Sequence, residues 1–140
     1  MKKKKYRWIT IILLVLLVAS IYFYVNSIRI SGVSDNGMWK VVYKKSLDEA
    51  EQGEWYGSIK QLNKQEVKVK GIKWLENGKT IADFTEFNEG RDEAGAETRL
   101  NPFYVEDLYG SNPPKKGYTY MISVIWEKDG KMHEDNFEIN

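Results

Sequence analysis

The sequence contains no cysteine, which removes several kinds of structure and chemistry at once. Disulfide crosslinks are excluded, and so is the lipid-bearing cysteine of a bacterial lipoprotein. Histidine occurs once, at His133, so a zinc site built from histidine and cysteine ligands is excluded as well. A catalytic role for His133 would require a nucleophile and an orienting acid in a shaped pocket. Its position after a turn, in a strand rich in charged residues, predicts neither.

Common catalytic motifs are also missing. The sequence has no Gly-x-Ser-x-Gly, no glycine-rich phosphate loop and no His-Glu-x-x-His. Proline is scarce, and two of the three prolines are adjacent, at Pro113-Pro114, where they exclude a central strand. We therefore expect no cofactor and no metal, and we expect that the protein is not an enzyme.

One unbroken apolar run, from Trp8 to Val25, stands out from the rest of the chain. At about 1.5 Å of rise per residue, a helix over this run reaches about 27 Å, close to the thickness of a bilayer's hydrocarbon core. The seven residues before it carry five positive charges. Positive charge favours the cytoplasmic side, so the pattern predicts a cytoplasmic segment over 1–7 and a transmembrane helix over 8–25.

A cleaved signal peptide is the alternative to an uncleaved anchor. A signal peptide has an apolar region of about 7–15 residues that ends in a small-x-small site. Here the run is longer, and it ends in aromatic residues of the kind that lie at the lipid headgroups: Tyr22, Phe23 and Tyr24, with Trp8 at the other end. The best cleavage candidate, Val25-Asn26-Ser27, would instead release a secreted protein starting at Ile28.

The near-neutral net charge of the chain is the sum of a positive N-terminal segment and a negative remainder. The whole sequence has a net charge of +1 and its first seven residues carry +5, so the remainder carries −4. A mildly acidic domain has no net electrostatic attraction to nucleic acid or to an anionic membrane surface. We therefore expect the lipid bilayer, through the N-terminal helix, to be a partner, and nucleic acid not to be one.

The pattern of residues after the apolar run predicts β structure. Glycine, serine, aspartate and asparagine over 26–37 predict a flexible tether, and 38–140 is long enough for one small domain. Alternating apolar and polar residues predict strands over 38–44, 54–62, 65–76, 80–87, 118–126 and 131–140. Short alternating strands separated by turns are typical of an antiparallel β-sandwich, here taken as immunoglobulin-like, with a small β-barrel as the alternative.

Local signals add detail to these strands. Asn77-Gly78 predicts a type I′ hairpin turn, Asp129-Gly130 predicts a second turn, and Gly71 coincides with a change of face that predicts a β-bulge. The strand over 118–126 is the longest alternating run and carries apolar residues on both faces, which predicts a central position in its sheet. Ser46-Leu47-Asp48-Glu49 fits a capping box at the start of a short helix, and an acidic loop fits equally well. We expect one helical turn over 105–109, and Ile81 on the core side of its strand.

Acidic side chains crowd one polar segment, 88–98, and the strand before it. They suggest either a paired-carboxylate hydrolase or a calcium site, but a solvated loop explains them more simply. The carboxylates are Asp83, Glu86, Glu89, Asp92, Glu93 and Glu97.

Aromatic residues are abundant, at 14 % of the chain. Most are expected to fill the core, because large rings bury much apolar surface. Three tyrosines flank the proline loop and are the candidates for a ligand-binding or partner-binding rim: Tyr104, Tyr109 and Tyr118. Such rings can stack on sugars or on a partner protein.

Two segments carry a resemblance to a known group. Trp39-Lys40-Val41-Val42-Tyr43 and Ile125-Trp126-Glu127-Lys128-Asp129-Gly130-Lys131 resemble strands of small exported proteins from Gram-positive bacteria of the Bacillus and Listeria kind. These proteins combine a lysine-rich start, a membrane segment or lipoprotein signal, and about 110 residues of β structure. The resemblance implies the sandwich and the location but no active site.

The sequence thus predicts a single-pass membrane protein, with a cytoplasmic N-terminus and an extracytoplasmic β domain. We expect a non-catalytic binding or accessory role at the cell envelope, with an envelope protein as the partner. A module that binds cell-wall glycan is the second hypothesis, and a carboxylate-dependent hydrolase is the third.

Overall fold

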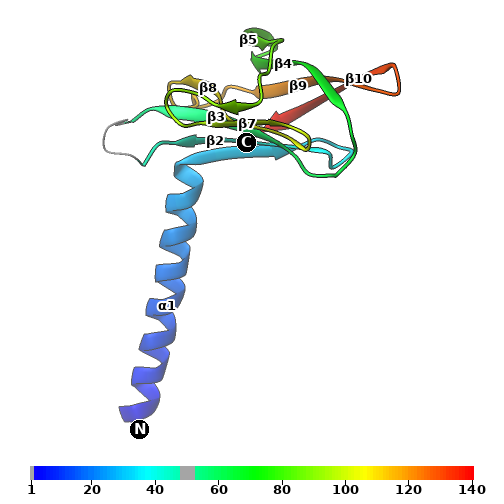
Figure 1. Ribbon diagram of the computed structural model, residues 1–140. Coiled ribbons are helices and arrows are strands. Elements are labelled where there is room, and N and C mark those ends of the chain that lie inside the picture. Colours follow the sequence, from blue (N-terminus) through cyan, green and yellow to red (C-terminus); the bar gives the residue numbers. More distant parts are fainter. Residues whose placement is uncertain (1, 48–52) are drawn as a thin grey trace.

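The computed structural model describes residues 2–47 and 53–140, which form one long helix followed by ten strands. Helix α1 (Lys2–Ser27) projects from one side of a β domain (Figure 1). The strands are β1 (Arg29–Val33), β2 (Trp39–Lys45), β3 (Trp55–Gln61), β4 (Lys68–Glu76), β5 (Lys79–Phe84), β6 (Gly90–Arg91), β7 (Glu97–Leu100), β8 (Phe103–Ser111), β9 (Tyr120–Lys128) and β10 (Lys131–Ile139).

Two antiparallel sheets form a sandwich, which confirms the predicted fold class. The six-stranded sheet has the order β1-β2-β3-β8-β7-β6, and the four-stranded sheet has the order β10-β9-β4-β5. This order differs from the four-plus-three arrangement of an immunoglobulin constant domain. The sheets meet along one side, where the backbones of Ser31 and Asn140 exchange two hydrogen bonds of 3.1 Å.

The core lies between the two sheets and is rich in aromatic rings. Trp39 and Trp74 are fully buried, one from each sheet, and Tyr43 packs edge-on against Trp74 at a centroid distance of 5.2 Å. Gly57 on β3 leaves the space that the Trp74 ring fills, because a Cβ there would come within 2.7 Å of the ring. Aromatic burial of this kind supplies much of the apolar area of a small domain without disulfides.

The segment expected to be a tether is largely structured. Helix α1 continues through Ser27, and β1 starts at Arg29, so a single residue, Ile28, separates helix from strand. β1 pairs with β2 along its whole length. In β1, Ile30 is the only strongly apolar residue that points inward. The other inward position is Gly32, where a side chain would clash with the Glu138 carbonyl. The sequence of β1 therefore shows no clear alternation of apolar and polar residues.

Several local predictions are confirmed. The β4–β5 turn has positive φ at both Asn77 (50°) and Gly78 (77°), as a type I′ turn requires. The pairing of β4 with β9 shifts register between Val69 and Gly71, which is the predicted bulge. β9 lies between β10 and β4, the central position expected for the longest alternating run.

Other local predictions are wrong. Residues 105–109 are part of strand β8 and do not form a helical turn. A register shift in the β3–β8 pairing interrupts their alternation and hides the strand. The polar segment 88–98 includes β6 and the start of β7, which pair as a hairpin. Ile81 points outward, because the β4–β5 pairing steps from Ala82 to Thr80 and leaves it unpaired. The possible capping box at 46–49 extends outside the described residues.

Candidate functional site

The three tyrosines predicted to form a rim lie in different surroundings. Tyr109 points into the sandwich and stacks on Trp74, with ring centroids 4.9 Å apart. Tyr104 is on the outer face of the six-stranded sheet, with the Arg99 guanidinium 5.0 Å from its ring centroid. Burial, and then the nearby Glu106 carboxylate, raise the pKa of Tyr104. The structure therefore does not bring these three rings together into one surface.

Tyr118 lies in the proline loop before β9, and this loop is fastened to the end of β4. Its ring is 44 % exposed and has the Lys115 ammonium 5.0 Å from its centroid. Lys115 also forms a salt bridge of 3.1 Å with Glu76, which raises the pKa of the Lys115 amine. The Tyr120 hydroxyl donates to the other Glu76 oxygen at 3.2 Å. These contacts hold the proline loop against the end of β4. They account for the position of Tyr118 without a ligand.

The acidic segment is spread over the surface. The Asp92 carboxylate accepts a hydrogen bond of 2.9 Å from the Ala96 backbone N–H and so closes the β6–β7 turn. A carboxylate oxygen of Glu97 lies 3.5 Å from Nε of Arg99. Among the described residues, no three histidine or carboxylate side chains are grouped closely enough to hold a metal ion. The segment has the geometry of a surface hairpin.

His133 belongs to a cluster that joins the two sheets. Its ring stacks on Trp126, with centroids 4.3 Å apart. The Trp126 indole donates to Asp135 at 2.8 Å, and the Trp39 indole, from the opposite sheet, donates to the same carboxylate oxygen at 2.9 Å. Asn36 supplies a third donor at 2.9 Å. A carboxylate that accepts three N–H groups is a strong crosslink, so this cluster stabilises the sandwich.

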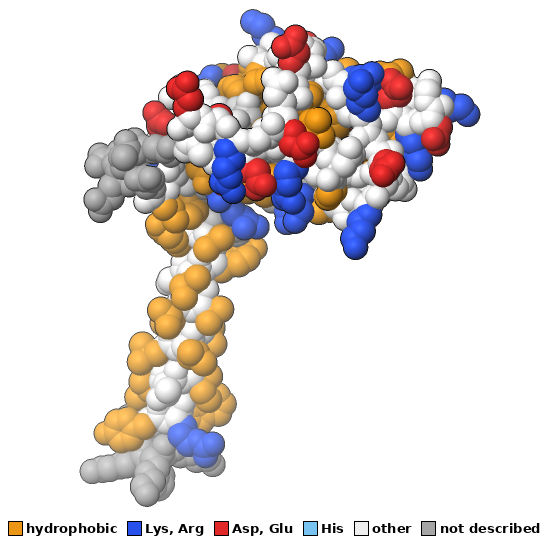
Figure 2. Space-filling view, viewed as in Figure 1, with side chains coloured by type: hydrophobic (Ala, Val, Ile, Leu, Met, Phe, Trp, Pro, Cys, Tyr) orange, Lys and Arg blue, Asp and Glu red, His pale blue; other side chains and the backbone are white. Residues whose placement is uncertain are grey.

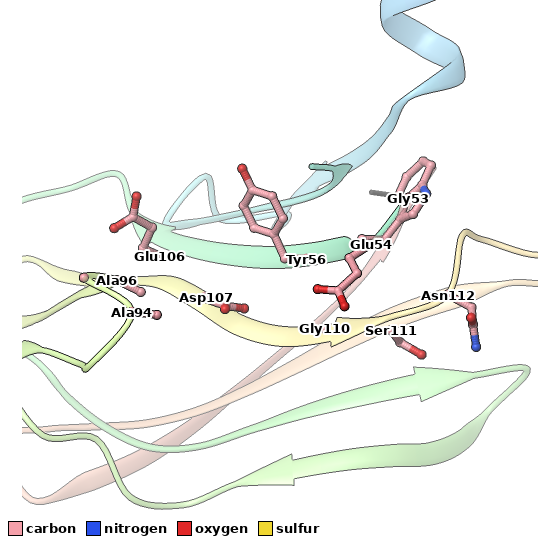
Figure 3. Close-up of a pocket in the computed structure, with 12 residues that line it drawn as sticks. Gly53, Glu54, Tyr56, Ala94, Ala96, Glu106, Asp107, Gly110, Ser111 and Asn112 are labelled. Atoms are coloured by element: carbon pink, nitrogen blue, oxygen red, sulfur yellow. The ribbon is translucent and has the colours of Figure 1, made fainter. Parts of the chain in front are cut away.

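An open pocket of about 690 Å³ lies beside β8. Figure 3 shows that its residues come from the start of β3, the second half of β8 and the β6–β7 turn. The lining residues are Gly53, Glu54, Trp55, Tyr56, Ala94, Gly95, Ala96, Glu106, Asp107, Gly110, Ser111 and Asn112.

The pocket exists because β8 extends beyond the end of its neighbour β7. β3 pairs with β8 from Tyr104 to Ser111, but β7 pairs with it only from Phe103 to Val105. Beyond that point, the side of β8 that faces away from β3 has no strand partner among the described residues. A strand edge without a strand partner is a place where the backbone of another chain can add a strand.

The pocket is acidic. Three carboxylates line it: Glu54, Glu106 and Asp107. Glu106 is held in place because its carboxylate accepts the Glu97 backbone N–H at 2.9 Å. Tyr56 supplies the aromatic surface, and Figure 3 shows its ring and the Glu106 side chain projecting from the same side of the sheet. Trp55 is 7 % exposed and belongs to the core.

Sequence reasoning missed this pocket for two reasons. Glu106 and Asp107 lie in the segment predicted as a helical turn, and Glu54 is distant from them in sequence. The usable signal was the run from Phe103 to Ser111, which is long enough for a strand and has glycine near its end. Comparison with known protein families, with curated proteins and with solved structures finds no match.

Proposed function

We propose that this protein is a single-pass, membrane-anchored binding module whose β domain lies outside the cytoplasm. Helix α1 contains a 20-residue apolar segment, Tyr6–Val25, none of which is buried within the described structure. Such a helix is a candidate anchor or signal sequence. Its continuation through the possible cleavage site at 25–27 favours the anchor, and the basic N-terminus favours a cytoplasmic start.

The ligand that best fits the pocket is an extended polypeptide segment containing lysine or arginine. The single observation that carries this proposal is that, among the described residues, the part of β8 beyond Val105 has a strand partner on one side only and borders an acidic pocket of about 690 Å³. The backbone of β8 supplies a strand-addition edge, and cationic side chains of the bound strand meet the carboxylates that line the pocket, Glu54 and Glu106. A cationic side chain there forms charge-assisted hydrogen bonds. The partner would be an exported or membrane protein of the envelope.

Peptide binding tests this proposal directly. The full chain, in nanodiscs of zwitterionic lipid, is titrated with decapeptides that alternate apolar residues with lysine, or with glutamine. We expect the lysine peptides to bind and the double variant Glu54→Gln/Glu106→Gln to lose at least about tenfold in affinity, because two charge-assisted contacts are removed. The carboxamide of glutamine can still accept the Glu97 N–H, so the fold is retained.

The matched control is Glu66→Gln/Glu138→Gln, which changes the net charge equally at two exposed positions outside the pocket. Equal affinity losses in the two double variants would show that net charge alone explains the loss. That result would contradict peptide binding at the pocket. If purified cell-wall glycan binds and the peptides do not, the proposed ligand is wrong and the protein is a glycan-binding module. Protease added to intact cells should digest the β domain, and its protection until the cells are opened would reject the orientation.

A further inference from the structure

The outer face of the six-stranded sheet carries positive charge close to the helix. Side chains on β2 alternate, with Trp39, Val41 and Tyr43 buried, so Lys40 and Lys44 point to the opposite face. Register places residues of β1 and β3 on that same outer face. The resulting basic face consists of Arg29, Lys40, Lys44 and Lys60.

These cations are arranged as like-charge pairs. Arg29 lies directly opposite Lys44, and Lys40 lies directly opposite Lys60. Like charges directly opposite on one sheet face repel and destabilise the pairing. Arg29, Lys40 and Lys60 have no ion-pair partner among the described residues, and Lys44 lies only over the Tyr56 ring, 5.3 Å from its centroid. An anionic surface outside the protein would relieve this repulsion.

The basic face is turned toward the side from which the helix leaves. In Figure 1 the strands run across the axis of α1, with β1 and β2 nearer the helix and β4 and β5 on the far side. Figure 3 agrees, because Tyr56 projects from the outer face of β3 toward the side where α1 lies. Figure 2 shows lysine and arginine side chains, with acidic side chains between them, along the border of the domain that adjoins the helix.

The short link keeps this face near the membrane. Only Ile28 separates α1 from β1, and one residue spans at most about 3.6 Å. Where α1 crosses a bilayer, the domain therefore lies within reach of the headgroups and within the screening length of their charge. The net charge of −4 for the chain after its first seven residues did not predict this, because net charge conceals where the cations are placed.

We propose that the outer face of β1, β2 and β3 binds the anionic headgroups of the membrane that α1 spans. The bound phosphate groups would pair with Arg29, Lys40, Lys44 and Lys60, and the domain would lie against the bilayer with the four-stranded sheet outward. This inference rests on the proposed anchoring by α1. It does not require a ligand at the β8 pocket, although Tyr56 of that pocket lies on the same outer face and under the Lys44 ammonium.

The test measures how closely this face approaches lipid in the full-length protein. The chain lacks cysteine, so a single dye can be attached at Ser58→Cys on the outer face of β3, or at Met132→Cys near the exposed β9–β10 turn. Spin-labelled headgroups quench a nearby dye. Nanodiscs contain either phosphatidylcholine alone or 40 mol % phosphatidylglycerol as well.

We expect phosphatidylglycerol to increase quenching at Ser58→Cys but not at Met132→Cys, and 1 M salt to reverse the increase. Lys40→Gln/Lys60→Gln should lower the ratio of lipid-bound to detached domain roughly 30-fold, because two membrane-facing charges are lost. The control Lys79→Gln/Lys131→Gln makes the same charge change on the four-stranded sheet and should leave that ratio unchanged.

Equal quenching in the two lipids, or equal effects of the two double variants, would overturn the proposal. Thermal unfolding by circular dichroism confirms that Lys40→Gln/Lys60→Gln is folded, and removing a like-charge pair should not lower its midpoint. Co-purification of the chain with the discs reports anchoring separately. A chain that is anchored but insensitive to phosphatidylglycerol therefore rejects the lipid-binding face and leaves the anchor intact.

Discussion

At the scale of single residues, the domain depends on close contact between backbone and aromatic rings. Gly57 is the clearest case, because the Trp74 ring from the opposite sheet lies where its side chain would be. Gly110, paired across from Tyr56, is different: a Cβ there would have its nearest neighbour at 3.6 Å, an ordinary contact. The two glycines lie on adjacent strands of one sheet but have different roles.

This difference gives a matched pair of variants. Gly57→Ala should destabilise the domain by about 1–3 kcal/mol, because the added methyl overpacks a rigid core ring. Gly110→Ala should change stability by less than about 0.5 kcal/mol. Urea unfolding followed by tryptophan fluorescence measures both. Equal losses for the two variants would show that backbone freedom, and not the Trp74 contact, explains the glycine at position 57.

At the scale of elements, strand pairing decides which apolar residues are buried. Ile81 and Ile122 are the same residue type in strands of one sheet. Ile122 is fully buried on β9, whereas Ile81 is 39 % exposed, where the β4–β5 pairing shifts register. Alternation alone placed Ile81 on the core side of its strand. Only the pairing partners show that β5 turns Ile81 outward.

We therefore expect very different costs for the two isoleucines. Ile122→Ala should cost about 2–5 kcal/mol, as for other fully buried large-to-small changes. Ile81→Thr should stay within about 0.5 kcal/mol of the parent, since it is a surface change to a residue that also favours strands. Chemical denaturation of the two variants provides the comparison. A large loss for Ile81→Thr would mean that β5 is paired in a different register.

At the scale of the whole molecule, aromatic groups tie the two sheets together. Tyr43 contacts Trp74 from the opposite sheet, and its hydroxyl donates to the Asn112 carbonyl at 2.7 Å. Burial, followed by the neighbouring Tyr109 and Tyr120, raises the pKa of the Tyr43 hydroxyl well above its usual value. The neutral phenol is therefore the form that fits the folded state.

This shift predicts how stability depends on alkaline pH. Above about pH 10 the phenol ionises in the unfolded chain but stays protonated in the folded one, so the unfolded state binds fewer protons and stability falls as pH rises. Tyr43→Phe should cost about 1 kcal/mol at neutral pH, through the lost hydrogen bond, and should make the alkaline decline shallower. Unfolding midpoints between pH 7 and 11.5 test this, and an unchanged slope would assign the decline to other groups.

The β8 pocket and the basic face show the limit of sequence reasoning about function. Both surfaces bring together residues that are separated along the chain: Glu54 with Glu106 in the pocket, and Lys40 with Lys60 on the face. The sequence shows each charge but not its neighbours. It also predicted a rim from Tyr104, Tyr109 and Tyr118 because they flank the proline loop, whereas the sheet turns Tyr109 inward.

The sequence by itself determined the apolar helix, the β class of the domain, its turns at Asn77-Gly78 and Asp129-Gly130, and the central place of β9. These features follow from local hydrophobic period, chain length and turn chemistry, which are encoded in neighbouring residues. Only the tertiary structure decided the one-residue link at Ile28, the inward or outward direction of Ile81 and the open edge of β8. Those depend on register and on where a partner strand ends, and non-local pairing alone sets both.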